Sequence, residues 1–375
     1  MLKKILKMML IIIVSMVALL LIVGFLFINL SPEFGGTPTK AEKEGFEKTD
    51  HFEDGKFINL TPTSMDMSFG SIVSSLKEFI KGVPNDKPNF NIPIESLDSI
   101  DIENNIKNRL VWFGHSAFLL QLDGKNILID PMFGQVPAPH PWLGGNRYGG
   151  LPIEIEQLPQ IDLIIISHDH YDHLDYGSIK KLIPKTKQFF VPLGVGAHFR
   201  AWGANEKLIK QFDWWDEVSL AEIAFTFTPS RHFSGRGFGD RSSTLWGGWV
   251  IKGKDKNLFF SGDSGYGSHF NTIGDKLGPF DFAMLECGQY NEKWAQIHMM
   301  PEETAQAGID VKAKLIMPIH WAAFTLALHE WTDPVERVTA KAAELNLPIL
   351  VPKIGASIWL QELNPSKEKW WLNKN

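Results

Sequence analysis

The 375-residue sequence contains a single cysteine, Cys287, and has no excess of basic residues. One thiol cannot form an intramolecular disulfide, and it excludes a zinc site built from several thiolates. Any metal ion must therefore be held by histidine and carboxylate side chains. The formal net charge of -6 gives no basic surface field, so nucleic acid is not expected as a partner. Internal repeats and low-complexity tracts are also absent, which excludes a solenoid.

Charged residues are absent from residues 8–28, an apolar run of about 21 residues that is long enough, as a helix, to cross roughly 30 Å of hydrocarbon. Lys3, Lys4 and Lys7 precede this run. The positive-inside rule therefore predicts a single-pass protein of the cell membrane with a cytoplasmic N-terminus and an extracytoplasmic main domain. A cleaved signal peptide is the alternative, but the run is long and residues 25–30 offer no small-x-small cleavage site.

The remaining sequence divides into three parts. Residues 31–105 are rich in Pro, Gly, Ser, Asp and Lys, which predicts a tether and a loosely structured N-terminal extension after the anchor at 1–30. Residues 106–365 interleave apolar strand patterns with helical patterns, which indicates one α/β domain, and 366–375 form a C-terminal tail.

Short apolar runs bounded by turn residues predict strands at 110–113, 117–122, 126–129, 163–166, 188–191, 223–228, 249–251, 258–260, 282–285 and 315–319. Helical patterns lie at 176–182, 301–311 and 334–345.

The strand predicted at 163–166 leads directly into the sequence His168-Asp169-His170-Tyr171-Asp172-His173. This H-x-H-x-D-H motif would arise by chance in on the order of one in a thousand chains of this length. A solvated polar loop is the alternative interpretation. A rigid strand that ends in several potential ligands, however, is what a metal site requires.

One loop cannot enclose a catalytic pair of metal ions, because each ion needs three or four protein groups and an exchangeable water. His232, Asp263 and His320 each follow the end of a predicted apolar strand. Any one of them alone is more often a surface or packing residue than a ligand. Their common position at strand ends favours a shared metal site.

This ordered set of residues resembles that of the metallo-β-lactamase superfamily, which implies an αββα sandwich and hydrolytic activity. The similarity covers most of the chain outside the anchor. Several shorter segments resemble the N-acylphosphatidylethanolamine-hydrolysing phospholipase D branch of that superfamily: 112–116, 128–131, 260–266, 278–281, 298–303 and 319–321.

The resemblance implies two metal ions in each chain. One ion would be held by three imidazoles, those of His168, His170 and His232. The other would be held by Asp172, His173 and His320, and Asp263 would bridge the two. Ions about 3.5–4 Å apart can share a hydroxide and clamp the oxygens of a phosphoryl group. Imidazole and carboxylate ligands favour zinc, although iron and manganese accept the same ligands.

Three further residues are assigned roles by the same resemblance. Asp130 would orient a ligating imidazole, although a strand-end turn explains it equally well. His298 would act in catalysis beside Asp172 and Asp263, either by contacting the substrate phosphate or by protonating the leaving alcohol; a helix cap is the alternative. His115, in a Gly-His-Ser turn, is expected to play a supporting structural role near the ligands.

The resemblance and the anchor together predict hydrolysis of a phosphodiester in a membrane phospholipid. N-acylphosphatidylethanolamine would give phosphatidic acid and an N-acylethanolamine. A lactonase acting on an acyl lactone or a sugar-phosphate lactone is the main alternative, because paired metals also activate water against carbonyl carbon. A non-catalytic zinc-binding envelope protein is a third possibility, and a β-lactamase is disfavoured because Cys287 lies outside the strand-end positions.

Overall fold

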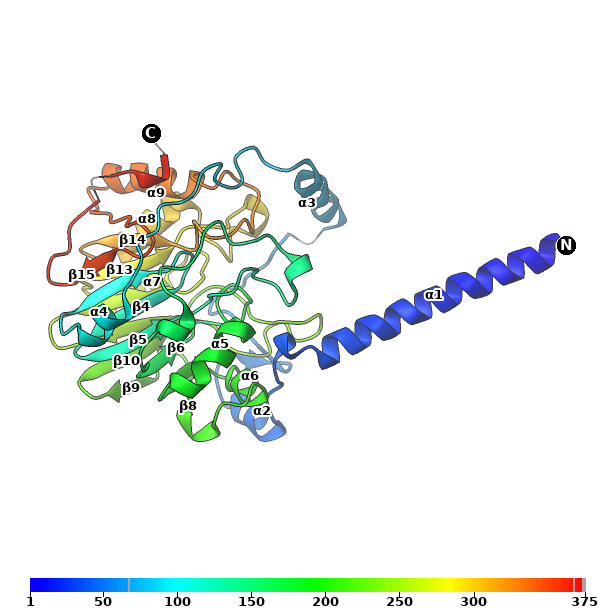
Figure 1. The fold of residues 1–375 in the computed structure, drawn as a ribbon, viewed down its shortest axis with the longest axis horizontal. Helices are drawn as coiled ribbons and strands as arrows, with labels where there is room; N and C mark the ends of the chain where they lie inside the picture. Colours follow the sequence, from blue (N-terminus) through cyan, green and yellow to red (C-terminus); the bar gives the residue numbers. More distant parts are fainter. Residues whose placement is uncertain (67, 367, 373–375) are drawn as a thin grey trace.

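The computed structural model describes residues 1–66, 68–366 and 368–372 (Figure 1). Its first element is α1 (Leu2–Leu30), a helix without buried residues that projects from the domain. By its length and composition, α1 could cross a membrane. Of the expected C-terminal tail at 366–375, positions 367 and 373–375 lie outside the described residues.

Two mixed β-sheets form the centre of the domain. In spatial order, the seven-stranded sheet contains β15 (Ser357–Trp359), β3 (Arg109–Trp112), β4 (Phe118–Leu122), β5 (Lys125–Ile129), β6 (Leu163–Ile165), β7 (Phe189–Pro192) and β8 (Ile209–Phe212). The six-stranded sheet contains β14 (Ile316–Ile319), β13 (Phe282–Glu286), β12 (Asn257–Phe260), β11 (Gly248–Lys252), β10 (Ile223–Thr228) and β9 (Glu217–Leu220). Strands β5 to β8 run parallel to one another, as do β12 to β14. Their carboxyl ends therefore meet along one edge of each sheet.

Helices cover the outer face of each sheet. The seven-stranded sheet packs against α5 (Tyr176–Leu182) and α6 (Gly196–Ala201), and the six-stranded sheet packs against α7 (His269–Leu277), α8 (Pro301–Asp310) and α9 (Asp333–Glu344). Short 3-10 helices occur at η1 (Pro32–Phe34), η2 (Pro141–Leu143), η3 (Ile155–Gln157), η4 (Ile183–Lys185), η5 (Glu206–Leu208), η6 (Glu292–Trp294) and η7 (Trp370–Leu372). The four layers confirm the expected αββα sandwich.

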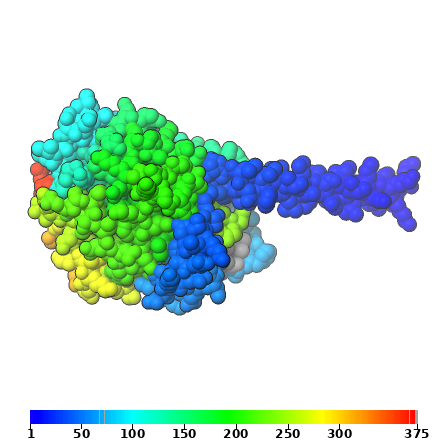
Figure 2. All heavy atoms as spheres, turned by 90° about the horizontal axis from the view of Figure 1, so that it is seen from below, coloured from blue at the N-terminus to red at the C-terminus, as the bar shows by residue number. Residues whose placement is uncertain are grey.

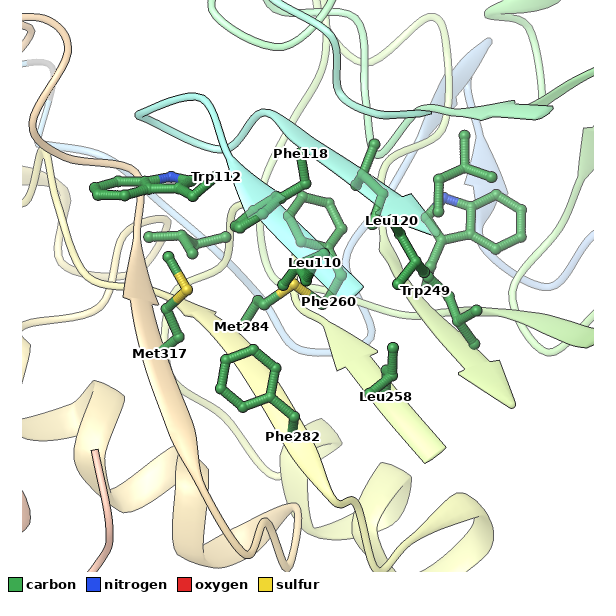
Figure 3. Close-up of a cluster of buried hydrophobic side chains, with 14 of the residues drawn as sticks. Leu110, Trp112, Phe118, Leu120, Trp249, Leu258, Phe260, Phe282, Met284 and Met317 are labelled. Carbon is green, nitrogen blue, oxygen red and sulfur yellow. The ribbon is translucent and has the colours of Figure 1, made fainter. Parts of the chain in front are cut away.

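The main hydrophobic core lies between the two sheets (Figure 3). Leu110 and Phe118 from one sheet face Phe260 and Met284 from the other, and all four side chains are fully buried. Alternate residues of each strand point into this layer, as the two-residue period of a strand requires. Each large apolar side chain buried in this way stabilises the fold by about 1.5–3 kcal/mol.

The segment between the anchor and the sheets packs onto the domain. It contains α2 (Lys40–Phe46), β1 (Phe52–Glu53), β2 (Lys56–Phe57), α3 (Phe69–Lys81) and α4 (Ser99–Asn104). Phe46 and Phe57 are buried in the main core. Glu42 accepts hydrogen bonds from Arg200 and Gln211. The extension is therefore more ordered than its polar composition indicates, because these few side chains attach it.

Candidate metal centre

The H-x-H-x-D-H loop is fixed at both ends. It begins just after β6, where Ser167 and His168 are buried directly behind the strand. It ends at Asp175, whose carboxylate accepts a 2.7 Å hydrogen bond from the Ser178 amide and caps α5. A buried strand and a capped helix therefore restrict the loop.

Three imidazoles meet in a first cluster. Nε2 of His168 lies 2.9 Å from Nδ1 of His170, which in turn lies 3.2 Å from Nε2 of His232. A carboxylate oxygen of Asp263 is 3.8 Å from both His168 and His232. These four residues together could hold a metal ion.

A second cluster lies directly beside the first. Oδ2 of Asp172 is 3.1 Å from Nε2 of His320 and 3.7 Å from Nε2 of His173. Oδ1 of Asp263 lies 3.1 Å from His173, and its Oδ2 lies 3.1 Å from His320. The Asp263 carboxylate therefore faces both clusters. The structure brings together all seven residues that the sequence suggested as ligands.

A glycine allows Asp263 to reach this position. Gly262 has a φ of +57°, and a Cβ atom there would approach the backbone oxygen of Gly247 to 2.5 Å and Cβ of Ser167 to 2.8 Å. Only glycine fits so close to both neighbours in this backbone conformation. The loop after β12 can therefore pack directly against the loop after β6.

The buried donor atoms fit a metal ion. Nε2 of His173 and Oδ1 of Asp263 are both buried, and neither has a hydrogen-bond partner. An unsatisfied buried polar atom costs roughly 1–3 kcal/mol, so a cation bound by both atoms would stabilise the fold. The combination of imidazole and carboxylate, without sulfur, suits a divalent transition metal.

The ring nitrogens that face away from the clusters form hydrogen bonds with neighbouring groups. Nδ1 of His173 donates to Asp130 at 2.7 Å, and Nδ1 of His232 donates to the backbone oxygen of Ile297 at 2.9 Å. These bonds leave the Nε2 lone pairs directed at the clusters. Asp130 also accepts a 2.7 Å hydrogen bond from the Ser167 amide. The structure thus places Asp130 behind a metal-facing imidazole, at the position that the sequence comparison suggested.

His115 belongs to the second cluster and does not only support it, because its ring could hold a metal ion together with Asp172, His173 and His320. Its Nε2 is 2.9 Å from Oδ2 of Asp172, and its backbone amide and oxygen pair with Trp321 and His320. His115 and His320 both have positive φ values, of 56° and 69°. Such strain in two non-glycine residues that touch each other is typical of a functional site.

His298 reaches the same centre from the loop before α8. Its Nδ1 donates to Glu286 at 2.6 Å, and one of its ring nitrogens lies within 4.8 Å of ligand atoms of Asp263 and His320. Glu286 is fully buried at the end of β13. Glu286 was not predicted from the sequence, although its position immediately after the apolar run at 282–285 matches that of the other candidates.

Burial and charge set the protonation of the metal-free centre. Burial lowers the pKa of His168 and of His232 well below the usual value, so both rings are neutral and can bind a cation. Burial alone would also lower the pKa of His320, but Asp263 and Asp172 raise it to about 10. In the metal-free centre, the two carboxylates therefore favour the protonated, positively charged form of His320. A bound metal ion would supply this positive charge instead.

A cavity of about 310 Å³ opens over the two clusters. Its polar floor contains His170, Asp172, Asp263, His298 and His320, and its walls are mainly apolar: Met65, Pro137, Tyr171, Phe233, Trp294, Ile297 and Leu326. A substrate with an apolar body and one polar group fits such a lining.

Cys287 takes no part in the metal centre, because its buried sulfur faces the backbone oxygen of Pro334.

Comparison with known proteins identifies the family of the chain. Residues 125–321 match the family model of the beta-lactamase superfamily domain. An uncharacterized protein of Mycobacterium tuberculosis is 37% identical over 333 residues, which cover 87% of this chain and 88% of that protein. The N-acyl-phosphatidylethanolamine-hydrolyzing phospholipase D 1 of Caenorhabditis elegans is 29% identical over 67% of this chain and 74% of its own length.

A solved structure shares the fold. A metallo hydrolase of the archaeon Ignicoccus hospitalis superposes with a TM-score of 0.51 and 22% sequence identity, over 67% of this chain and 97% of the archaeal protein.

Proposed function

The chain belongs to the β-lactamase superfamily as one of its metal-dependent hydrolases, and we propose that it hydrolyses phosphodiester bonds in membrane phospholipids. The observation that carries this proposal is the position of Asp263, whose carboxylate lies within 3.1 Å of His173 and of His320 and within 3.8 Å of His168 and His232. A carboxylate between two ligand clusters is the arrangement of a two-metal hydrolase.

We assign the ligands by cluster, with Asp263 shared between the two ions, because it belongs to the first cluster and lies 3.1 Å from His173 and from His320. The first ion takes His168, His170 and His232, and the second takes Asp172, His173 and His320. Zinc is the proposed metal, and iron and manganese are the alternatives. When bound, two such ions activate water at neutral pH and stabilise the charge of a phosphoryl transition state.

His298 is the residue of this chain best placed to exchange a proton with the substrate. Glu286 fixes one edge of the imidazole, and the ring lies beside the Asp263 carboxylate on the cavity floor. From there it can contact a phosphate oxygen or protonate the leaving alcohol. The walls at Tyr171, Phe233 and Trp294 give the cavity an aromatic lining beside this floor.

The membrane is the proposed source of the substrate. Helix α1 has the length and composition of a membrane span, and lysines precede its apolar run. The positive-inside rule supports a catalytic domain outside the cytoplasm. Similarity to the C. elegans phospholipase favours N-acylphosphatidylethanolamine, with phosphatidic acid and an N-acylethanolamine as products.

The test uses the full-length chain, purified in detergent and supplied with zinc. Three substrates are compared: N-acylphosphatidylethanolamine, a soluble bis-aryl phosphodiester and an acyl lactone. We expect both phosphodiesters to be cleaved and the lactone to remain closed. Opening of the lactone without cleavage of either phosphodiester would reject the proposal in favour of a lactonase. An Asp263→Ala chain that turned over any of the three substrates as fast as the unaltered protein would show that the activity does not come from this centre.

A further inference from the structure

Helix α3 turns its apolar side away from the domain. Its outward side chains include Phe69, Phe79 and Ile80, with exposed fractions of 82%, 75% and 76%. Phe69, Val73, Leu76 and Ile80 recur at the spacing of one helical stripe. A helix on the surface of a globular domain normally buries such a stripe and exposes its polar side.

The polar side of α3 faces the protein instead. Nζ of Lys293 lies 3.0 Å from the Ser74 hydroxyl, 3.2 Å from that of Ser75 and 3.0 Å from the Glu78 carboxylate. The Ser68 hydroxyl caps the first turn of the helix. Polar contacts therefore hold α3 in place while its apolar stripe stays uncovered. A stripe of several large side chains held in this way indicates an apolar surrounding on that side.

The position of α3 relative to α1 indicates the nature of the apolar surrounding. Figure 1 shows α3 on the side of the domain from which α1 projects, and Figure 2 shows the same arrangement after a quarter turn. Near the end of α1, the ring of Phe27 lies 6.1 Å from that of Trp142, another exposed apolar residue. An exposed apolar side chain therefore lies beside the base of the anchor, and α3 lies on the same side of the domain (Figure 1).

A second cavity lies between α3 and the cavity over the metal clusters. It has a volume of about 770 Å³ and is lined by Leu76 and Phe79 of α3. Trp294 and Leu326 line both this cavity and the one over the metal clusters. The cavity beside α3 therefore adjoins the cavity over the metal clusters.

We propose that α3 lies in the interfacial layer of the same bilayer that α1 crosses, with its apolar stripe among the lipid chains. Lys77 and Lys81 flank the stripe and can contact anionic headgroups. The inference rests on the proposed anchoring by α1 and is independent of the reaction catalysed. Its consequence is that a lipid reaches the metal centre sideways, from the bilayer, past Leu76 and Phe79.

The test places a polarity-sensitive dye on a cysteine in the full-length chain, reconstituted into vesicles of phosphatidylethanolamine and phosphatidylglycerol. Ile80→Cys reports on α3. Ile106→Cys is the matched control, since Ile106 is 91% exposed and follows α4, on the side away from α1 (Figure 1). The unsubstituted chain gives the background from the buried Cys287.

We expect blue-shifted emission from the dye at position 80, and quenching of that emission by a quencher attached to lipid chains, with neither effect at position 106. Equal, water-like emission at both positions would overturn the proposal. A blue shift that lipid-borne quenchers do not affect would also overturn it, because the stripe would then be covered by a second copy of the chain.

Measurements of hydrolysis provide an independent test of the position of α3. Ile80→Asp should lower hydrolysis of phospholipid in vesicles by about tenfold, equivalent to about 1.4 kcal/mol, while hydrolysis of the soluble bis-aryl phosphodiester stays unchanged. Ile106→Asp should affect neither substrate. If the unaltered chain hydrolyses neither substrate, the proposed function fails, whereas the dye measurements still decide the position of α3.

Discussion

The carboxylate of Glu286 lies 2.6 Å from Nδ1 of His298 and 3.5 Å from Nδ1 of His320. One buried carboxylate at the end of β13 thus contacts both the proposed catalytic histidine and a proposed metal ligand. Glu286 also accepts hydrogen bonds from the backbone amides of Ser264 and Met299, each at 3.2 Å. It therefore joins the loop after β12, the loop before α8 and the end of β14 into one rigid unit.

The first prediction concerns His298. His298→Ala should lower kcat by about 10²- to 10⁴-fold, the usual contribution of a general acid or base. The metal content should not change, because the seven proposed ligands remain. Glu286→Gln should also lower kcat, and its effect should be smaller in the His298→Ala background, because the part of the effect that passes through the His298 imidazole is already lost there. Metal loss in parallel with activity in His298→Ala would instead make His298 a ligand.

The second prediction concerns the residue behind His173. Asp130→Asn removes the charge that receives the Nδ1 proton of His173 but keeps the size of the side chain. We expect metal affinity to fall by about 10- to 100-fold, measured by competition with a chromophoric chelator. The matched variant Asp255→Asn, in the exposed turn between β11 and β12, should bind metal normally. Equal affinities in the two variants would remove Asp130 from the metal centre.

The third prediction concerns Asp263. Asp263→Ala should abolish binding of at least one of the two ions and lower turnover by more than about 100-fold, because the shared carboxylate is lost. Asp255→Ala serves as the control for the general effect of removing an aspartate. A chain that kept both ions without Asp263, as shown by elemental analysis, would contradict the bridging assignment.

The fourth prediction concerns the stability of the metal-free chain. Burial lowers the pKa of His115 to about 3, with a further contribution from His320, and burial lowers that of His269 to about 3. An unfolded histidine titrates near 6.5. These two residues therefore contribute stability above about pH 6.5 and lose it as the pH falls toward 3.

His320 acts in the opposite sense, because its raised pKa gives stability below about pH 6.5 that is lost as the pH rises through about 10. Calorimetry after chelation should therefore show Tm falling between pH 7 and pH 4. His269→Gln should make this decrease less steep, since His269 lies outside both ligand clusters. A Tm independent of pH over this interval would contradict the buried, neutral state of these rings.

Much of the fold could be predicted from the sequence, since each buried strand is a short apolar run. The expected strand at 223–228 coincides with β10, and the expected helix at 176–182 coincides with α5. Strands β8 and β9 were missed because they are partly exposed and carry polar side chains such as those of Lys210 and Glu217. Their place in the sheets depends on neighbouring strands rather than on their own composition.

The candidate site could be predicted because its residues follow the apolar runs that predict the strands. His232, Asp263 and His320 follow apolar strands, and strand ends meet in this fold. Glu286 follows such a strand as well, and it could have been found by applying the same criterion. The orientation of α3 could not have been predicted, because an apolar stripe has the same spacing whether it faces a core or a bilayer. Trp294 lines two cavities, and this could not have been predicted because each cavity is formed by segments that are distant in the sequence.

Elemental analysis of the purified full-length chain, together with a chelated and zinc-reloaded sample, tests the two-metal centre most directly. We expect about two metal ions per chain, loss of phosphodiester hydrolysis on chelation and its recovery with zinc. A chain that binds no metal ion, or that hydrolyses the phosphodiester equally well after chelation, would contradict this expectation.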